Sequence, residues 1–196
     1  MSSGAVRGAD GLLRCPWGDG PDDYRDYHDT EWGRPVRGDA ALFERLSLEG
    51  FQAGLSWLTI LRRREGFRAA FADFDINSVS EYDESDVVRL LSDAGIIRHR
   101  GKIEAVIGNA RVLRRWQETE GDGALDALVW SFADLGTAAH AGPRTLADVP
   151  SETAASRALS RELKARGWRF LGPTSAYAAL QAVGVVNDHL ETCHAR

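Results

Sequence analysis

The chain has 196 residues, of which 43% are hydrophobic and 27% are charged, and its formal net charge is −5 at pH 7. These proportions are ordinary for a globular protein, and no apolar run approaches the roughly 20 residues that span a bilayer, which excludes a membrane partner. Two cysteines near opposite ends do not suggest a disulfide framework, and the N-terminus has no signal-peptide pattern. We therefore expect a cytoplasmic protein that is monomeric by default.

The charge is unevenly distributed along the chain. Residues 1–50 contain ten acidic and six basic residues, whereas residues 96–115 contain six basic residues and only Glu104 as an acid. An acidic total argues against a nucleic-acid-binding protein, but a local basic face can still bind nucleic acid because distribution matters more than the sum. The net charge alone therefore does not exclude such a partner.

The hydrophobic pattern predicts an all-α fold. Residues 1–13 lack periodicity and are expected to be a mobile N-terminal extension, which leaves residues 14–196 as a single domain. Asp39 and Ser56 are candidate helix N-caps, and Asp83 is expected to start a helix. No β alternation or internal repeat is present, and residues 73–77 and 137–150 are expected to be loops. Apolar residues follow helical spacing over residues 40–52, 57–70, 83–95, 103–118, 124–132, 153–166 and 175–183.

A glycine-bounded turn, residues 167–174, separates the last two expected helices. Pro173 suits a first helical turn, and the free N–H groups of that helix start favour an anion such as a phosphate. The preceding helix is basic, with Arg157, Arg161, Lys164 and Arg166. Two interpretations remain open: a phosphate-binding hairpin, or an ordinary helical hairpin with a solvated basic face.

The two cysteines can form a metal site with two of the five histidines. Cys15 and His28 lie 13 residues apart, and His189 and Cys193 lie four apart, a spacing that puts both on one face if the segment is helical. Two cysteines and two histidines make a closed, tetrahedral zinc site of the structural type. The alternative is two buried free cysteines with unrelated histidines. His194 is a second candidate ligand, while His99 and His140 are expected at the surface.

A single acidic residue interrupts the apolar segment from Leu48 to Trp57. Glu49 needs a partner if it lies on the inner side of a helix, and that partner is either structural or a ligand. Five aromatic residues accompany it, and an aromatic cage with one carboxylate suits a flat cationic ring. The alternative is an aromatic core, which we favour for Trp32. The aromatic residues are Trp17, Tyr24, Tyr27, Trp32 and Trp57.

Several motifs together make the chain closely similar to the DNA-3-methyladenine glycosylase I family, within the helix-hairpin-helix glycosylases. They extend over nearly everything from Cys15 to Cys193. Residues 1–13 precede the usual start of the family, and some relatives continue beyond the last cysteine. The motifs are Cys15-x-Trp17, Tyr27-His28-Asp29-x-Glu31-Trp32-Gly33, Leu48-Glu49-Gly50-x-Gln52-Ala53-Gly54-Leu55-Ser56-Trp57, residues 93–103, Gly108-Asn109-Ala110-Arg111 and Val186-Asn187-Asp188-His189.

The resemblance implies a two-lobed, all-helical fold and a defined set of site residues. Structural Zn²⁺ would be held by Cys15, His28, His189 and Cys193. The base pocket would consist of Trp17, Tyr24, Tyr27, Glu49 and Trp57, with Glu49 recognising the base and possessing a potential catalytic role. Gly167, Arg169, Gly172 and Thr174 would contact the DNA backbone. Asn187 would replace the catalytic Asp of the wider superfamily, with Asp188 as the alternative counterpart.

The implied activity is the release of 3-methyladenine from double-stranded DNA in base excision repair. The nucleotide would be flipped out, and hydrolysis would proceed without strand cleavage because no lysine lies in the hairpin. One competing hypothesis is a non-catalytic DNA-binding module with the same hairpin and zinc site. Another is a zinc-dependent hydrolase, which is disfavoured because four protein ligands leave zinc no open position.

Overall fold

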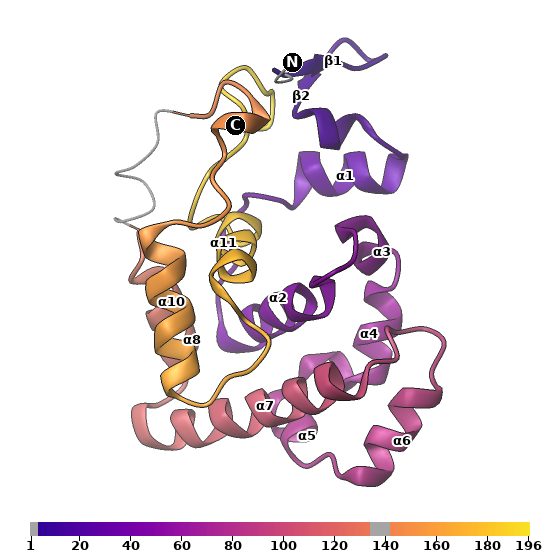
Figure 1. Cartoon of the computed structure of the whole chain (residues 1–196), viewed down its shortest axis with the longest axis vertical. Coiled ribbons are helices and arrows are strands. Elements are labelled where there is room, and N and C mark those ends of the chain that lie inside the picture. Colours follow the sequence, from indigo (N-terminus) through magenta and orange to yellow (C-terminus); the bar gives the residue numbers. More distant parts are fainter. Residues whose placement is uncertain (1–3, 134–141) are drawn as a thin grey trace.

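The computed structural model describes residues 4–133 and 142–196, and the chain is mostly helical (Figure 1). None of the described helices has the length and apolar character needed to cross a membrane. The elements are β1 (Val6–Arg7), β2 (Leu13–Arg14), η1 (Pro16–Asp19), α1 (Asp22–Thr30), α2 (Asp39–Gln52), α3 (Trp57–Leu61), α4 (Arg64–Ala70), η2 (Ala72–Phe74), α5 (Ile76–Ser80), α6 (Glu84–Ser92), α7 (Arg100–Glu120), α8 (Ala124–Trp130), η3 (Leu146–Asp148), α10 (Ala154–Ala165) and α11 (Pro173–Ala182), where η marks a 3₁₀ helix.

Six of the seven expected helices are confirmed as single elements, namely α2, α6, α7, α8, α10 and α11. The predicted cap at Ser56 is also confirmed, since its side chain accepts the backbone N–H of Thr59. Asp83 lies at the predicted start of α6 and is its N-cap, since its side chain accepts the backbone N–H of Ser85. The prediction for Asp39 is wrong. Gly38 is the N-cap of α2, and Asp39 instead accepts the N–H groups of Gly123 and Asp126 at the start of α8.

Three segments differ from the sequence prediction. The helix expected over residues 57–70 is divided into α3 and α4, with Arg62 and Arg63 between them. The loop expected over residues 73–77 contains part of η2 and the start of α5. The loop expected over residues 137–150 lies partly outside the described residues, and its described part contains the single 3₁₀ turn η3.

The N-terminal segment has regular structure where we expected a mobile extension. The two strands pair in antiparallel register, with Val6 opposite Arg14, so the described part of the chain is not purely helical. Arg14 is buried and forms bidentate contacts with Asp10 and Asp29, at 2.6–3.0 Å. The pair with Asp29 joins the hairpin to α1, which explains why a segment without an apolar pattern still packs against the domain.

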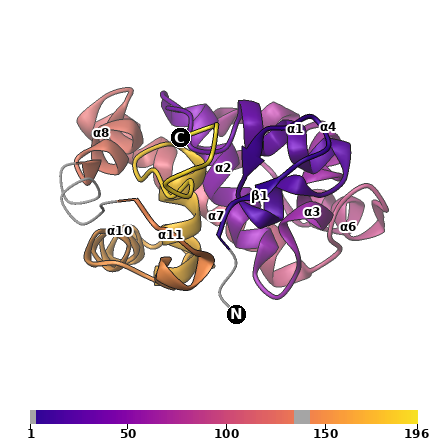
Figure 2. The ribbon, with the colours of Figure 1, turned by 90° about the horizontal axis from the view of Figure 1, so that it is seen from above.

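Helix α2 occupies the centre of the fold, with α7, α8, α11 and α3 around it (Figures 1 and 2). Its inward residues Leu42, Phe43, Leu48 and Phe51 are fully buried in the main hydrophobic core. Complete burial of each such side chain contributes roughly 1.5–3 kcal/mol, so α2 is held rigidly. A site built on α2 is consequently a site on a firmly packed element.

The two ends of the described chain lie at the same end of the molecule (Figure 1). The N–H of His194 donates to the carbonyl of Leu13 at 2.8 Å, which joins the C-terminal segment to β2. A second, small apolar cluster forms there from Cys15, Leu190, Cys193 and Ala195. Little apolar area is available at this end, so other interactions must contribute to its stability.

Candidate active site and metal centre

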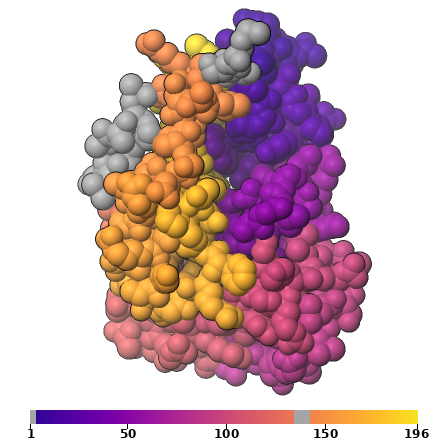
Figure 3. Space-filling view, in the orientation of Figure 1, coloured from indigo at the N-terminus to yellow at the C-terminus, as the bar shows by residue number. Residues whose placement is uncertain are grey.

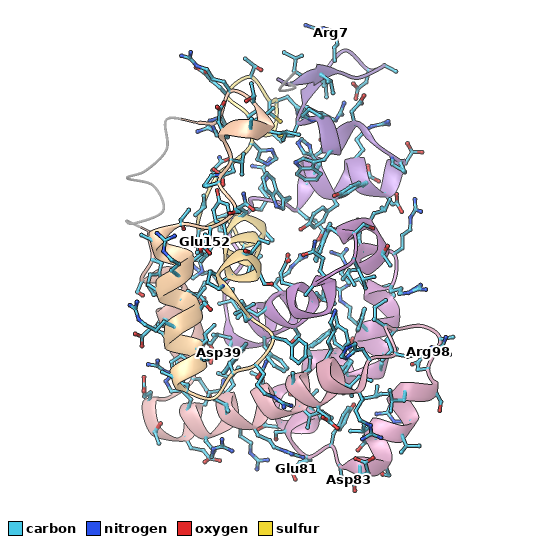
Figure 4. The ribbon with its side chains drawn as sticks, viewed as in Figure 1. Arg7, Asp39, Glu81, Asp83, Arg98 and Glu152 are labelled. Carbon is cyan, nitrogen blue, oxygen red and sulfur yellow. The ribbon has the colours of Figure 1, made fainter. Side chains whose placement is uncertain are left out.

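A cavity of about 170 Å³ opens between the segment from Trp17 to Trp32 and the helices α2, α3 and α11. Figure 3 shows a hollow where the indigo N-terminal part meets the yellow C-terminal part, and Figure 4 shows side chains from these helices converging. Ligand pockets for drug-sized molecules measure roughly 300–1,000 Å³, so this cavity suits a ligand the size of one base. Its lining residues are Trp17, Tyr24, Tyr27, Trp32, Glu49, Gln52, Trp57, Ala178 and Gln181.

The structure brings all five sequence-predicted pocket residues, Trp17, Tyr24, Tyr27, Glu49 and Trp57, to this cavity. Our preference for Trp32 as a core residue is wrong, because its half-buried ring lines the cavity as well. Sequence reasoning also missed Gln52, Ala178 and Gln181. Gln52 lies three residues after Glu49 on the same helix face, a signal that was available. The two α11 residues could not be found without the tertiary structure.

Glu49 carries a carboxyl group that the fold buries without a positively charged partner. The side chain is 3% exposed, and its Oε2 atom has no hydrogen-bond partner among the described residues. Burial raises the pKa of Glu49 from 4.5 to about 8, and the charge of Arg45 offsets this only in part. An unpartnered buried carboxyl at a cavity wall is costly, and such groups mark sites where a ligand completes the hydrogen bonding.

The nearest arginines are occupied by a different carboxylate. Arg45, one helical turn before Glu49, donates to Glu31 at 3.0 Å, and Arg64 donates to Glu31 at 2.9 Å. This pairing lowers the pKa of Glu31, despite the opposing effect of burial, to about 2. Glu31 therefore uses the available positive charge, and Glu49 is left free to respond to a charge that arrives with a ligand.

The aromatic residues that line the cavity also pack against one another. Tyr27 and Trp57 have ring centroids 5.4 Å apart, and Trp17 and Tyr24 have centroids 5.2 Å apart. The indole Nε1 of Trp57 is buried without a partner among the described residues. Aromatic faces with nearby acceptors attract a flat ring that is electron-poor or cationic.

Cys15, His28, His189 and Cys193 come together as a buried cluster that could hold a metal ion, since their ligand atoms all lie within 4.8 Å of one another. Cys193 Sγ lies 3.5 Å from His28 Nε2 and 3.5 Å from His189 Nδ1, and Cys15 Sγ lies 3.8 Å from His189 Nδ1. Zinc bonds of about 2.3 Å to sulfur and 2.0–2.1 Å to nitrogen put tetrahedral S and N ligands about 3.6 Å apart. The spacing therefore fits this ion.

The second nitrogen of each histidine has an acceptor, as metal-bound histidines require. His28 Nδ1 lies 2.7 Å from a carboxylate oxygen of Asp29, and His189 Nε2 lies 3.1 Å from the carbonyl oxygen of Trp32. These acceptors select the tautomers whose lone pairs face the sulfur atoms. The expected helical turn is absent, because residues 189–193 form turns, yet the two side chains still meet.

Outer groups complete the cluster. His194, the alternative ligand, instead contacts Asp29 at 3.0 Å, outside the four-residue group.

A hydrogen bond with Cys15, followed by those with His189 and His28, lowers the pKa of Cys193, which favours the thiolate that binds metal. Gly18 packs against His28 so closely that a Cβ there would lie 2.4 Å from the imidazole ring.

The metal cluster and the cavity share their walls. The ring of Trp17 lies edge-on to His28 with centroids 4.8 Å apart, and Trp32 lies edge-on to His189 at 4.7 Å. Trp17 and Trp32 also contact each other at 4.9 Å. Both indoles line the cavity, so the orientation of the two histidines determines the shape of one side of the pocket.

The residues predicted to contact DNA lie apart from the cavity, in the turn between α10 and α11. Gly167, Arg169, Gly172 and Thr174 are all exposed there. Gly167 has a φ of +100°, a conformation that favours glycine, and Pro173 begins α11 as expected. His99 is exposed, as predicted, and its side chain caps α7, while His140 lies outside the described residues.

The two candidates for the missing catalytic aspartate behave differently. Asn187 is exposed, and its side-chain oxygen accepts the N–H of His189. Asp188 is buried, where its carboxylate accepts the hydroxyl of Tyr177 and the amide Nε2 of Gln181, the latter at 2.8 Å. Asp188 thus contacts a cavity residue without lining the cavity itself.

Comparison with known proteins gives consistent matches. A family model described as methyladenine glycosylase matches residues 17–196. The chain is 48% identical over 182 residues to DNA-3-methyladenine glycosylase 1 of Escherichia coli, covering 93% of this chain and 96% of that protein. A crystal structure of 3-methyladenine DNA glycosylase I matches with a TM-score of 0.85 at 44% identity, covering 92% of this chain and 98% of the other.

A structure from Staphylococcus aureus, which addresses 3-methyladenine recognition by its 3-methyladenine DNA glycosylase I, has a TM-score of 0.84 and 32% identity over 93% of this chain and 95% of that one. The residues matched by the family model include every residue that lines the cavity and three of the four residues of the metal cluster, His28, His189 and Cys193. The chain therefore belongs to the methyladenine glycosylase family.

Proposed function

We propose that this protein is a monofunctional DNA glycosylase that releases 3-methyladenine from alkylated double-stranded DNA in base excision repair. Family membership supports the activity, and the observation that carries the proposal is the buried, unpaired carboxyl of Glu49 in a base-sized aromatic cavity. Methylation at N3 gives adenine a formal positive charge. A cationic base is therefore the ligand that this cavity lacks.

Charge explains how the cavity selects the damaged base. A neutral adenine leaves Glu49 with its raised pKa of about 8, so the acid stays largely protonated at neutral pH. A cationic base lowers that pKa, because an opposite charge nearby favours the carboxylate. The attraction between carboxylate and base arises only with the methylated ligand. Selectivity of this kind supplements the lower cost of flipping a damaged base out of the stack.

Hydrolysis without strand cleavage follows from the positions of the amines. A glycosylase with lyase activity needs an amine that attacks the sugar. The chain has two lysines: Lys164 is exposed on α10, and Lys102 is buried with its Nζ on two backbone carbonyls. Neither lines the cavity. We infer that water attacks the anomeric carbon, and that the positively charged base leaves without strong acid catalysis.

We assign α10, the turn at residues 167–174 and α11 as a helix-hairpin-helix that holds the DNA backbone. The free N–H groups at the start of α11, including those of Gly172 and Thr174, are suited to bind phosphate. Arg169, in the same turn, is exposed. A Cβ on Gly172 would meet nothing within 4 Å, so a phosphate has room to approach. The hairpin and the cavity then contact the backbone and the flipped base of one DNA duplex.

We further propose that Cys15, His28, His189 and Cys193 hold a structural Zn²⁺ ion. The 3.5–3.8 Å sulfur–nitrogen spacings and the acceptors behind both histidines support this ligand set. Four protein ligands leave no open position, so the ion would stabilise the fold and take no part in hydrolysis. Its role would be to hold both chain ends, and with them Trp17 and Trp32, against the cavity.

The test is base release from methylated double-stranded DNA by the wild-type protein and two matched variants. Glu49→Gln should reduce the single-turnover rate of 3-methyladenine release on the order of 10- to 100-fold, as expected for a lost charge-assisted contact. Glu44→Gln, on the same helix but paired with Arg68, should release base at the wild-type rate.

Three outcomes would contradict the proposal. If the wild-type protein binds methylated DNA but releases no base, it is a DNA-binding module without catalysis. If Glu44→Gln slows release as much as Glu49→Gln, the effect comes from damage to α2 and not from the cavity. Loss of release after metal removal, with the fold and the base affinity intact, would instead support a zinc-dependent hydrolase.

A further inference from the structure

Helix α7 carries two buried polar side chains that the proposed chemistry does not use. Lys102 is 7% exposed and Asn109 is 5% exposed. They lie seven residues apart, which is close to two helical turns, so both project from one face of α7. That face runs beneath both α2 and the turn between α10 and α11 (Figure 1). Each side chain makes its contacts with backbone atoms of one of these two segments.

Lys102 holds the end of α2 at the mouth of the cavity. Its Nζ donates to the carbonyl of Phe51 at 2.9 Å and to the carbonyl of Ala53 at 2.6 Å. Carbonyls at a helix C-terminus lack intrahelical partners, and a cation there also satisfies the helix dipole. The loop that follows, residues 53–56, is exposed and joins the cavity residues Gln52 and Trp57.

Asn109 holds the turn that precedes α11. Its Nδ2 donates to the carbonyl of Arg169 at 3.2 Å, and its Oδ1 accepts the N–H of Arg169 at 2.9 Å. The side chain thus pairs with one residue as a neighbouring β-strand would, and it fixes both the position and the direction of the turn. The next residue, Phe170, has a φ of +60°, so the chain is held through a sharp, unfavourable bend.

Close packing leaves the turn little freedom to move relative to the cavity. A Cβ on Gly50 of α2 would lie 3.2 Å from the carbonyl oxygen of Phe170, and a Cβ on Gly101 of α7 would lie 3.5 Å from the Phe170 ring. Glu49, which precedes Gly50, lines the cavity from the same helix. The turn is therefore packed closely against both α2 and α7.

We infer that Lys102 and Asn109 are positioning residues that set the separation between the cavity mouth and the DNA-holding turn. The inference rests on the proposed function, because it requires that the turn at residues 167–174 holds DNA. A base flipped from a duplex reaches the cavity only when the backbone is held at the right distance from it. Misplacement by about 1 Å can cost on the order of 100-fold in rate. Helix α7 determines that distance through these two side chains.

The test separates binding of the free base from excision out of DNA. Lys102→Met and Asn109→Leu should bind free 3-methyladenine, followed by tryptophan fluorescence, within about twofold of wild type. Their kcat/KM for release from methylated DNA should fall on the order of 10- to 100-fold. Asn109→Asp, which keeps the acceptor and loses the donor, should retain an intermediate rate.

Gln117→Leu is the matched control. Gln117 lies on α7 and donates to Asp39 at 2.7 Å, far along the helix from both contacts, so its loss tests destabilisation alone. The inference is overturned if Gln117→Leu slows excision equally at a matched loss of thermal stability. It is also overturned if base binding falls as far as excision, or if excision is unchanged. A wild-type protein that releases no base would contradict the proposed function instead.

Discussion

Glu49 is a buried carboxyl group whose missing hydrogen-bond partner a cationic ligand can supply. Its side chain is buried on α2, the arginine one turn away is paired with Glu31, and no described residue donates to its Oε2. Burial of an unpaired acid destabilises the empty protein, and a cationic ligand reverses that cost. The same residue therefore links stability, pH and substrate selection.

The raised pKa of Glu49 predicts a pH-dependent stability. Its pKa rises from 4.5 to about 8 on folding, so between these values the folded state binds a proton that the unfolded state has lost. Stability contributed by this group therefore falls as pH rises from about 4.5 to 8. The advantage of Glu49→Gln over wild type should grow by a few kcal/mol between pH 5 and 8.5, measured by urea unfolding.

Glu44→Gln serves again as the control for changes to α2, because Glu44 lies on the same helix and is paired with Arg68. Both variants keep the metal cluster, so its own titration cancels in the comparison. A difference between Glu49→Gln and wild type that is the same at both pH values would contradict the raised pKa.

Asp29 predicts a measurable outer contribution to metal binding. It accepts from His28 at 2.7 Å while Arg14 holds its carboxylate in place at 2.7–3.0 Å. Loss of such a partner typically weakens metal affinity 10- to 100-fold. Asp29→Ala should show this loss in competition with a zinc chelator. Asp26→Ala, an exposed change on the same helix, should bind zinc like wild type; equal affinity in both variants would argue against the role of Asp29.

Among the helices, α8 depends on a cap that comes from another part of the chain. Asp39 at the start of α2, labelled in Figure 4, accepts the N–H groups of Gly123 and Asp126 and the side-chain amide of Gln117, at 2.7–3.0 Å. The residue has the local pattern of an N-cap for its own helix. Its carboxylate instead satisfies unpaired donors at the start of α8, whose N-cap Gly123 lies 84 residues later in the chain.

Removal of this remote cap should destabilise the protein more than removal of a local one. Asp39→Ala leaves three buried or half-buried donors without their acceptor, so we expect a loss of about 2–4 kcal/mol in the free energy of unfolding. Asp122→Ala, an exposed change beside α8, should change it by less than about 0.5 kcal/mol. Urea unfolding followed by circular dichroism measures both, and similar values for the two variants would refute the capping role.

The break between α3 and α4 coincides with contacts to other parts of the chain. No glycine or proline lies between Trp57 and Ala70 apart from Gly66, which is inside α4. Around the break, Arg62 donates to Asp23 of α1 at 2.6 Å, and Arg64 donates to Glu31 at 2.9 Å. Contacts to Asp23 and Glu31 therefore accompany the break between the two helices. The apolar spacing of residues 57–70 gives no indication of these contacts.

Across the whole molecule, the two chain ends meet at a metal cluster that also shapes the cavity. The local apolar cluster contains only four buried residues, so burial alone contributes little stability there. Trp17 and Trp32 lie against the metal-facing histidines on one side and the cavity on the other. Loss of the metal should therefore affect both the stability of the fold and the binding of the base.

Chelation of the metal should lower the thermal unfolding midpoint on the order of 10 °C and weaken binding of free 3-methyladenine, with a change in tryptophan emission. Differential scanning calorimetry and fluorescence titration, with zinc content followed by elemental analysis, check the three effects. Cys193→Ser should begin with the lowered midpoint and respond little to chelator. A protein that loses its zinc without any change in midpoint would contradict a structural site.

Local patterns in the sequence are sufficient for most of the helices and for the family. Apolar spacing identifies α2, α7 and α10 because each buries one face, and the motif around Glu49 identifies the pocket residue because an acid within an apolar segment is unusual. The ligands Cys15, His28, His189 and Cys193 were proposed from residue type and resemblance. Cys15 and His189 lie 174 residues apart, a separation that says nothing about their distance in space, and only the folded chain brings the ligand atoms of all four residues within 4.8 Å of one another.

The arrangement of the site depended on contacts between segments that are distant in sequence. Trp32 lines the cavity beside His189 of the metal cluster, and Gln181 lines it from α11. The hairpin formed by β1 and β2 is joined to α1 by the contact between Arg14 and Asp29. Buried polar groups take whichever partner the packing supplies, so a local pattern can specify that a partner is required but cannot name it. Helix formation is local, whereas the pairing of Lys102, Asn109 and Asp39 exists only after the chain has folded.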